Sequence, residues 1–131
     1  METKELNLTE FFQAEPQVIF ELFMDQEKQS KYTETKCTVG REAGEEFSCY
    51  DGWVLGKNVV IVQDEKIIQE WRSNDWVEGH YSNLTIELIP KNNGTELLLS
   101  QTEIPADKIE DITKGWKSHY FDKMKKYLNE N

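Results

Sequence analysis

Histidine, glycine and cysteine are scarce in this chain of 131 residues, and each scarcity removes a class of site. The two histidines, His80 and His119, form neither an HExxH nor an HxxxH pair, so no metal site can be read from their spacing. The seven glycines form no GxGxxG or P-loop pattern, which argues against nucleotide binding of those kinds. There is no GxSxG motif, and no local signature joins a cysteine to a histidine. We therefore expect no catalytic residue, no metal ligand and no cofactor.

The two cysteines, Cys37 and Cys49, form no CxxC pair. We expect two reduced thiols, with Cys49 buried, and a disulfide between them stays open as the alternative.

Basic residues are also few, since 15 Lys and Arg face 25 Asp and Glu, for a net charge of −10. This balance argues against nucleic acid and against an anionic membrane surface, because both attract clusters of Lys and Arg. No apolar run approaches the roughly 20 residues of a membrane-spanning helix, and the N-terminus lacks the pattern of a signal peptide. We expect a cytoplasmic protein without membrane insertion, a monomer forming a single domain over residues 1–131.

What the chain does have is clear periodicity, beginning with a strand and two short helices. Leu6, Leu8 and Phe12 fall on one face of a strand. Pro16 suits the first position of a helix, and Asp25 can cap a second one that ends near Tyr32.

The middle of the chain predicts a meander of five antiparallel strands, half exposed to water. In the cleanest strand, Leu84 and Ile86 face one way while Thr85 faces the other. Gly56 lies inside a strand pattern and indicates a bulge or a close backbone approach. The five expected strands cover residues 45–50, 53–63, 67–72, 82–90 and 95–102.

The last part of the chain predicts one long amphipathic helix, from near Asp107 or Ile109 to about Asn129. Gly115 interrupts it, and we expect close packing against the sheet to be the reason. The apolar residues that recur at every fourth position are Ile112, Trp116, Tyr120, Met124 and Leu128. Two short helices, a curved antiparallel sheet and this helix make an α+β domain.

The four tryptophans are the strongest functional signal, and two interpretations of them stay open. They can belong to the core and its rim, or several can line a cavity between helix and sheet or a patch for a partner. The loop acids Asp75 and Glu78 lie near His80, but such a cluster is more typical of a solvated turn than of acid–base chemistry. The tryptophans are Trp53, Trp71, Trp76 and Trp116.

Four runs, taken in order, resemble the C-terminal domain of the activator of heat-shock protein 90 ATPase, within the START/Bet v 1-like superfamily (SRPBCC). The resemblance covers about Glu5 to Leu128. The runs are GEEFSCYDGWVLGKNVVI, WRSNDWVEGHYSNLTIEL, GTELLLSQTEIP and GWKSHYFDKMKKYL.

The resemblance implies a helix-grip fold, in which a curved antiparallel sheet wraps around the long C-terminal helix and leaves a groove. In the wider superfamily that groove binds lipids, sterols, hormones or polyketide-like ligands, and a minority of members are enzymes. The eukaryotic activator has a separate N-terminal domain with no counterpart here, so the resemblance implies chaperone binding more directly than activation. Asp64 stands where many relatives have proline, and we expect a local difference in that turn.

Three hypotheses about function follow. The first is a non-catalytic module that binds an apolar small molecule or a protein segment in the groove. The groove residues we expect are Phe47, Trp71, Trp76, Leu84, Ile86, Trp116, Tyr120 and Phe121.

The second hypothesis is a chaperone cofactor that contacts a heat-shock protein 90 homologue through the loop residues Trp76, Glu78, His80 and Tyr81. The third is an enzyme of the cyclase or aromatase kind, with His80 or His119 acting beside Tyr120. We expect these groups to lie outside the groove or at its edge, which disfavours the third hypothesis.

Overall fold

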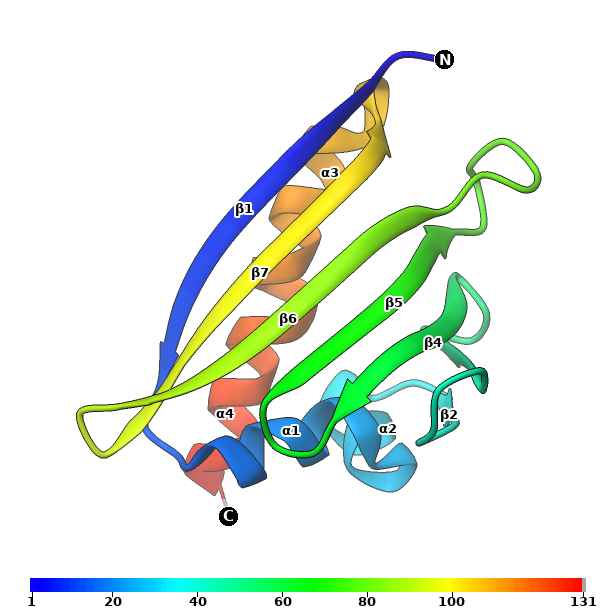
Figure 1. Ribbon diagram of the computed structural model, residues 1–131. Coiled ribbons are helices and arrows are strands. Elements are labelled where there is room, and N and C mark those ends of the chain that lie inside the picture. Colours follow the sequence, from blue (N-terminus) through cyan, green and yellow to red (C-terminus); the bar gives the residue numbers. More distant parts are fainter. Residues whose placement is uncertain (131) are drawn as a thin grey trace.

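The computed structural model describes residues 1–130, and within them seven strands form one antiparallel sheet in the order β1-β7-β6-β5-β4-β3-β2 (Figure 1). The five-strand meander expected from the sequence corresponds to β3 to β7, and β1 returns beside β7. The strands are β1 (Thr3–Phe12), β2 (Thr38–Val39), β3 (Glu46–Cys49), β4 (Val54–Val62), β5 (Lys66–Ser73), β6 (Ser82–Lys91) and β7 (Gly94–Pro105).

Alternation of apolar and polar residues decides which face of each strand is buried. In β6, Leu84, Ile86 and Leu88 are buried, as their spacing predicts. The β6–β7 hairpin closes with Asn92 and Asn93, which both have positive φ, the backbone conformation that a two-residue turn of this kind needs.

Two short helices follow β1, α1 (Pro16–Met24) and α2 (Gln26–Thr33), as the sequence predicts. Pro16 occupies the first turn of α1. The Asp25 side chain accepts a hydrogen bond from the backbone N–H of Lys28 at 3.0 Å and so caps α2.

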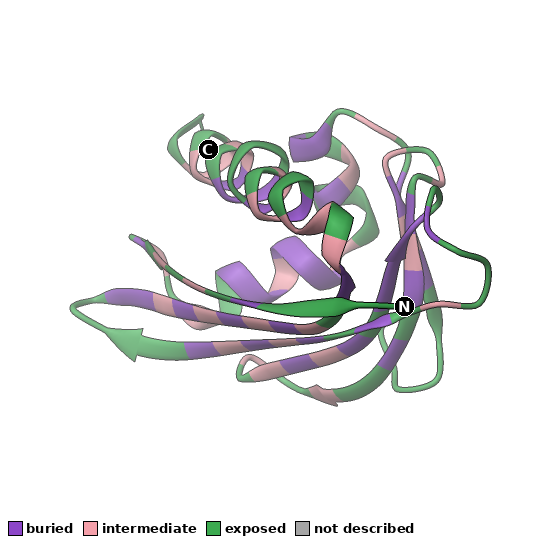
Figure 2. Cartoon of the chain, turned by 90° about the horizontal axis from the view of Figure 1, so that it is seen from above, coloured by how far each residue is buried: buried purple, intermediate pink, exposed green. Residues whose placement is uncertain are grey.

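The C-terminal helix lies across the concave face of the sheet and begins with a short 3₁₀ turn (Figures 1 and 2). Its middle turn is π-helical, with hydrogen bonds that span five residues instead of four, a feature that the apolar periodicity does not predict. The segments are η1 (Ala106–Lys108), α3 (Ile109–Gly115), η2 (Trp116–Phe121) and α4 (Asp122–Glu130). No helix within residues 1–130 is long and apolar enough to cross a membrane.

The helix-grip fold is therefore confirmed. Figure 2, which views the molecule from above, shows the sheet curving around the C-terminal helix. The helix buries Ile112, Trp116, Tyr120 and Met124 from the predicted stripe, and these side chains pack into one core cluster with the sheet. Leu128 packs against that cluster while remaining partly exposed.

The expectation of reduced thiols was wrong, because Cys37 and Cys49 form a disulfide in the structure. Strands β2 and β3 are antiparallel, with Thr38 opposite Ser48. The same register brings the flanking cysteines face to face, 4.1 Å apart between Cα atoms. The pairing depends on a strand of two residues, which no pattern in the sequence predicts.

The expectation for Gly115 was also wrong. A Cβ atom built there meets only His119 Cδ2, at 3.7 Å, so no sheet backbone requires a glycine. The expected close approach exists instead at Gly56, where a Cβ atom would lie 1.9 Å from the carbonyl oxygen of Glu70.

Asp64 lies in the β4–β5 turn, and the local difference expected from relatives with proline there stays a prediction. This residue has φ of 63°, a value that proline cannot adopt because its ring holds φ near −65°.

Candidate functional site: an aromatic cavity beneath the C-terminal helix

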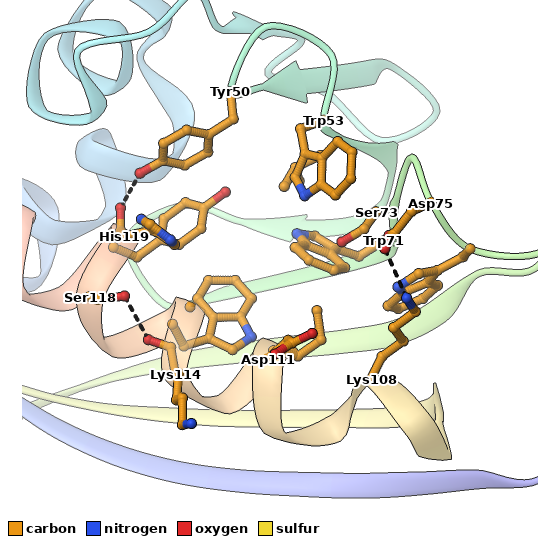
Figure 3. A pocket seen from close by; sticks show the side chains of 16 residues that line it. Tyr50, Trp53, Trp71, Ser73, Asp75, Lys108, Asp111, Lys114, Ser118 and His119 are labelled. Atoms are coloured by element: carbon orange, nitrogen blue, oxygen red, sulfur yellow. Dashed lines mark hydrogen bonds and ion pairs between the residues drawn. The ribbon is translucent and has the colours of Figure 1, made fainter.

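A cavity of about 630 Å³ lies between the first half of the C-terminal helix and the adjacent ends of β4 and β5 (Figure 3). The sheet contributes Val54 and Trp71, and the helix contributes Ile112, Trp116 and Tyr120. The volume lies within the range of small-molecule sites, about 300–1,000 Å³.

Aromatic rings form a continuous row along the cavity. The ring centroids of Trp76 and Trp71 are 5.7 Å apart, and those of Trp71 and Trp116 are 5.8 Å apart. Trp116 lies 4.7 Å from Tyr120, which in turn lies 5.8 Å from Tyr50. Five rings from three parts of the chain therefore present one apolar wall.

The indole nitrogens of Trp116 and Trp76 differ in their hydrogen bonding. The Trp116 indole donates to Gln101 Oε1 at 2.8 Å, and Gln101 Nε2 donates to Ser82 Oγ at 2.9 Å. That hydroxyl donates to the carbonyl oxygen of Trp71 at 2.7 Å, which completes a buried network. The Trp76 indole nitrogen is buried as well, yet it has no hydrogen-bond partner within residues 1–130.

The turn between β3 and β4 covers the cavity from the sheet side. Tyr50 and Asp51 have positive φ, as does Gly52. The Tyr50 hydroxyl donates to the carbonyl oxygen of His119, which ties this turn to the helix (Figure 3). Burial raises the pKa of Tyr50 to about 12, so its hydroxyl stays protonated at neutral pH. Trp53 is 50% exposed at the edge of the same turn.

Charged side chains stand at the mouth of the cavity. Lys108 and Asp75 form an ion pair at 2.9 Å, drawn in Figure 3, and the hydrogen bond from Asp75 raises the pKa of Lys108. Asp111, Lys114 and His119 complete the mouth. Two acids thus face two lysines there, so the mouth carries little net charge.

Four of the expected groove residues line this cavity: Trp71, Trp76, Trp116 and Tyr120. Three others, Phe47, Leu84 and Ile86, line a second void of only about 20 Å³, whose lining also includes Trp71, Trp116 and Tyr120.

Phe121 lies elsewhere in the core, where its ring packs 6.0 Å from that of Phe12. Tyr50 was not expected to line the cavity, and the ion pair between Lys108 and Asp75 at the mouth was not expected either. The Asp51–Gly52 turn signal could have pointed to the aromatic residues on either side of it.

The loop expected to bind a partner, residues 76–81, has one side in the cavity and one side in water. Trp76 faces the cavity wall, while Glu78 is exposed and Val77 is 64% exposed. His80 Nε2 lies 2.7 Å from the carbonyl oxygen of Glu103, which anchors the end of the loop. Tyr81 is exposed beside the guanidinium of Arg72, 5.8 Å from its ring.

Buried Arg72 holds this loop from within. Its guanidinium donates to the carbonyl oxygen of Trp76 at 2.8 Å and, more weakly, to that of Ser73 at 3.3 Å. The Trp76 backbone is therefore fixed by the strand that carries Trp71.

The arrangement of the two histidines does not resemble an acid–base pair aimed at a bound substrate. His80 is engaged with the Glu103 backbone, and His119 lies exposed at the mouth with its ring against Tyr50. Burial raises the pKa of Tyr120 well above its usual value, so its phenol is a hydrogen-bond donor rather than a base at neutral pH.

The sequence matches the family model described as "Activator of Hsp90 ATPase homolog 1-like protein" over residues 13–129. It is 32% identical to "Activator of 90 kDa heat shock protein ATPase homolog 1" of Homo sapiens, over 94% of this chain and 36% of that protein. It is 35% identical to the corresponding Dictyostelium discoideum homologue, over 94% of this chain and 32% of that protein. The chain thus spans about a third of the length of these curated relatives.

Solved structures give the same picture at the level of the fold. The crystal structure of PFC0360w, an HSP90 activator from Plasmodium falciparum, superposes with a TM-score of 0.91 at 28% identity, covering 95% of this chain and 96% of that one. Ara h 8.0201 superposes with a TM-score of 0.79 at 13% identity, covering 99% of this chain and 100% of that one, a likeness of fold alone.

Proposed function

This chain belongs to the Activator of Hsp90 ATPase homolog 1-like protein family, and from that premise we propose that it is a non-catalytic domain whose cavity binds an apolar small molecule. The observation that carries the proposal is the cavity of about 630 Å³ with its aromatic wall. The family is named for activation rather than for catalysis, which fits a binding role.

Burial of apolar surface is the force that would hold such a ligand. At about 25 cal/mol per Å², a ligand that hides about 250 Å² of apolar surface gains about 6 kcal/mol before the entropic cost of association. The ligand's own apolar face would supply most of that surface, because Trp71 and Trp116 are only 4% and 3% exposed.

Gly115 offers a direct test, because it lines the cavity and has free space around its Cα. A Gly115→Leu variant extends a side chain over the opening without backbone strain, since Gly115 has helical dihedral angles. We expect it to weaken binding of the uncharged fluorescent probe N-phenyl-1-naphthylamine at least about tenfold, as befits a blocked apolar pocket. Lys117→Leu places the same side chain on the exposed face of the helix and serves as the matched control.

Probe fluorescence and amide chemical shifts measure both variants against the natural chain. Shifts confined to residues around Trp71 and Trp116, lost in Gly115→Leu but kept in Lys117→Leu, would support the proposal. Absence of localised binding to the natural chain, or equal affinity in both variants, would refute it.

A second candidate is a co-chaperone that binds or stimulates a heat-shock protein 90 homologue. It is supported by the similarity to PFC0360w, which is named an HSP90 activator and of which this chain covers 96%. The exposed side of the loop is the contact we propose, because Val77 lies there near the exposed acids Asp75 and Glu78, and an apolar group with polar groups around it suits an interface.

A pull-down with the heat-shock protein 90 homologue of the same organism, together with its ATPase rate, tests this candidate. Val77→Glu should abolish the interaction while leaving probe binding in the cavity intact. If the natural chain neither binds nor stimulates the chaperone, this candidate is removed and the cavity proposal stands.

A further inference from the structure

Among the four tryptophans that stand out in the sequence, Trp53 is the one in contact with water. It is 50% exposed, whereas Trp71, Trp76 and Trp116 are each 5% exposed or less. Trp53 nevertheless lines the same cavity as the other three. An indole ring is one of the largest apolar groups in proteins, so an exposed one at the edge of a cavity leaves apolar surface that a ligand can cover.

The backbone of Trp53 is held on both sides, while its indole is not. The backbone N–H donates to the carbonyl oxygen of Tyr50 at 3.1 Å, and the carbonyl oxygen accepts from the N–H of Asn74 at 2.7 Å. Within residues 1–130, the indole ring joins no aromatic pair and its Nε1 makes no hydrogen bond. Trp53 also lies outside the core cluster. The ring can therefore turn about its two side-chain bonds without breaking a hydrogen bond of the fold.

The other exposed residues around the cavity are charged or polar. Figure 3 shows Trp53 and Asp111 on opposite sides of the cavity, one on the β3–β4 turn and the other on α3. Among the exposed lining residues within residues 1–130, Trp53 alone has an apolar side chain. Charged groups lose free energy when they give up their water without a partner, so they are poor covers for an apolar ligand, whereas an indole is a good one.

We propose that Trp53 seals the cavity: once an apolar ligand has entered, the indole packs on the part of the ligand that faces the mouth. This inference rests on the proposed function and adds to it the residue that controls how fast the ligand leaves. The contact covers apolar surface of both the ring and the ligand, and that gain offsets the entropy lost by fixing one side chain with two rotatable bonds.

The solvent exposure of the indoles tests the closure in the natural chain. The neutral chelate gadodiamide speeds the relaxation of protons that lie at the protein surface, and the indole N–H signal of Trp53 is identified by its loss in Trp53→Phe. We expect this enhancement to fall at least about twofold when N-phenyl-1-naphthylamine is added, because the half-exposed ring becomes covered. The indole signals of Trp71 and Trp116 are the internal control, since both rings are buried already.

The rate of probe release tests the seal itself. In stopped-flow displacement, Trp53→Ala should release the probe about tenfold faster than the natural chain, because a contact made after entry acts mainly on the dissociation rate. Trp53→Phe keeps a smaller ring and should show a smaller rise. Phe11→Ala removes an exposed ring of β1 that does not line the cavity, so it should leave the release rate unchanged. We expect Trp53→Ala to fold, because Trp53 lies outside the core cluster.

The outcomes separate this inference from the proposed function. Probe binding around Trp71 and Trp116 without protection of Trp53, or release from Trp53→Ala within about twofold of the natural rate, would overturn the seal and leave the proposed function in place. Loss of chaperone binding in Trp53→Ala with an unchanged release rate would also overturn it and would assign the ring to a partner surface. Absence of localised probe binding to the natural chain would overturn both.

Discussion

The two ends of the helix–sheet interface differ, although the same helix spans both. At the end under α4, Met124 and Phe121 are fully covered, and Phe121 packs edge-on against Phe12. At the end under α3, Ile112 and Trp116 border the cavity instead.

The difference arises from topology rather than from hydrophobicity. Helices α1 and α2 cover the α4 end, where Tyr32 of α2 packs 6.3 Å from Tyr127 (Figure 1). At the other end, the Tyr50 turn and the Trp76 loop approach the helix across the cavity. The apolar stripe of the helix runs through both ends. The cavity therefore lies at the end that α1 and α2 do not cover.

The largest expected effect is a difference in the free energy of unfolding between core variants at the two ends. Met124→Ala should lower the free energy of unfolding by about 2–5 kcal/mol, because it leaves a sealed void in the core. Ile112→Ala should cost less than half as much, since one side of Ile112 already faces open space. Urea denaturation measures both, and equal losses would contradict the distinction between the ends.

The disulfide lies next to the Tyr50 turn, at the cavity end of the interface. Breaking it should therefore affect the cavity end more than the filled end. Cys49 directly precedes Tyr50, and the bridge spans 12 residues of sequence. Reduction should lower the free energy of unfolding by about 3 kcal/mol, from the loop entropy restored to the unfolded chain. Hydrogen exchange should quicken at the Tyr50 turn more than around Met124.

A double variant, Cys37→Ser with Cys49→Ser, is the control for this experiment. Its stability should match that of the reduced protein and should not respond to reductant. A response of the natural chain no larger than that of the double variant would contradict the prediction.

Substitutions at two glycines should change stability in opposite directions, because one glycine is tightly packed and the other is not. Gly56→Ala should cost about 1–3 kcal/mol, because its Cβ would collide with the Glu70 carbonyl oxygen and the Phe47 ring. Gly115→Ala should instead raise stability by about 0.5–1 kcal/mol, since alanine favours the helix and the cavity leaves room for it. Thermal and urea unfolding give the two signs, and a loss in Gly115→Ala would show that its surroundings are not open.

The smallest expected effect concerns the hydrogen bond between the Tyr50 turn and the helix. Tyr50→Phe removes the hydrogen bond to the His119 carbonyl and should cost about 1 kcal/mol at neutral pH. Burial raises the Tyr50 pKa from 10.0 to about 12, so its contribution is complete below pH 10 and is lost as the pH rises towards 12. Unfolding measured between pH 8 and pH 11 should show a shallower alkaline decline in the variant than in the natural chain.

Much of the fold could be predicted because local signals and packing agree. The alternation of Leu84, Ile86 and Leu88 and the cap at Asp25 both depend on neighbours in sequence. The disulfide could not be predicted, because the register of β2 against β3 forms only in the folded sheet.

The sequence predicted that aromatic residues line the candidate site, but it did not predict the full set of lining residues. Trp71 and Trp116 were expected to line a groove, and they line the cavity. Tyr50 joins them from a turn, and turns carry no periodicity that would indicate which way a side chain points. Phe121 was expected in the groove because it widens the apolar stripe of the helix, yet its ring packs against Phe12 at the filled end.

The π-helical turn from Trp116 to Phe121 determines the direction in which the side chains of α4 point relative to those of α3. In an ideal helix, residues five apart point in clearly different directions, because each residue turns the chain by about 100°. Here the rings of Trp116 and Phe121 stack with centroids 6.1 Å apart. If the same residues formed a regular α-helical turn, α4 would be rotated by about 100° relative to α3, so Met124 would leave the core while Trp116 kept its place. The wider hydrogen-bond spacing of this turn therefore decides which side chains of α4 reach the core.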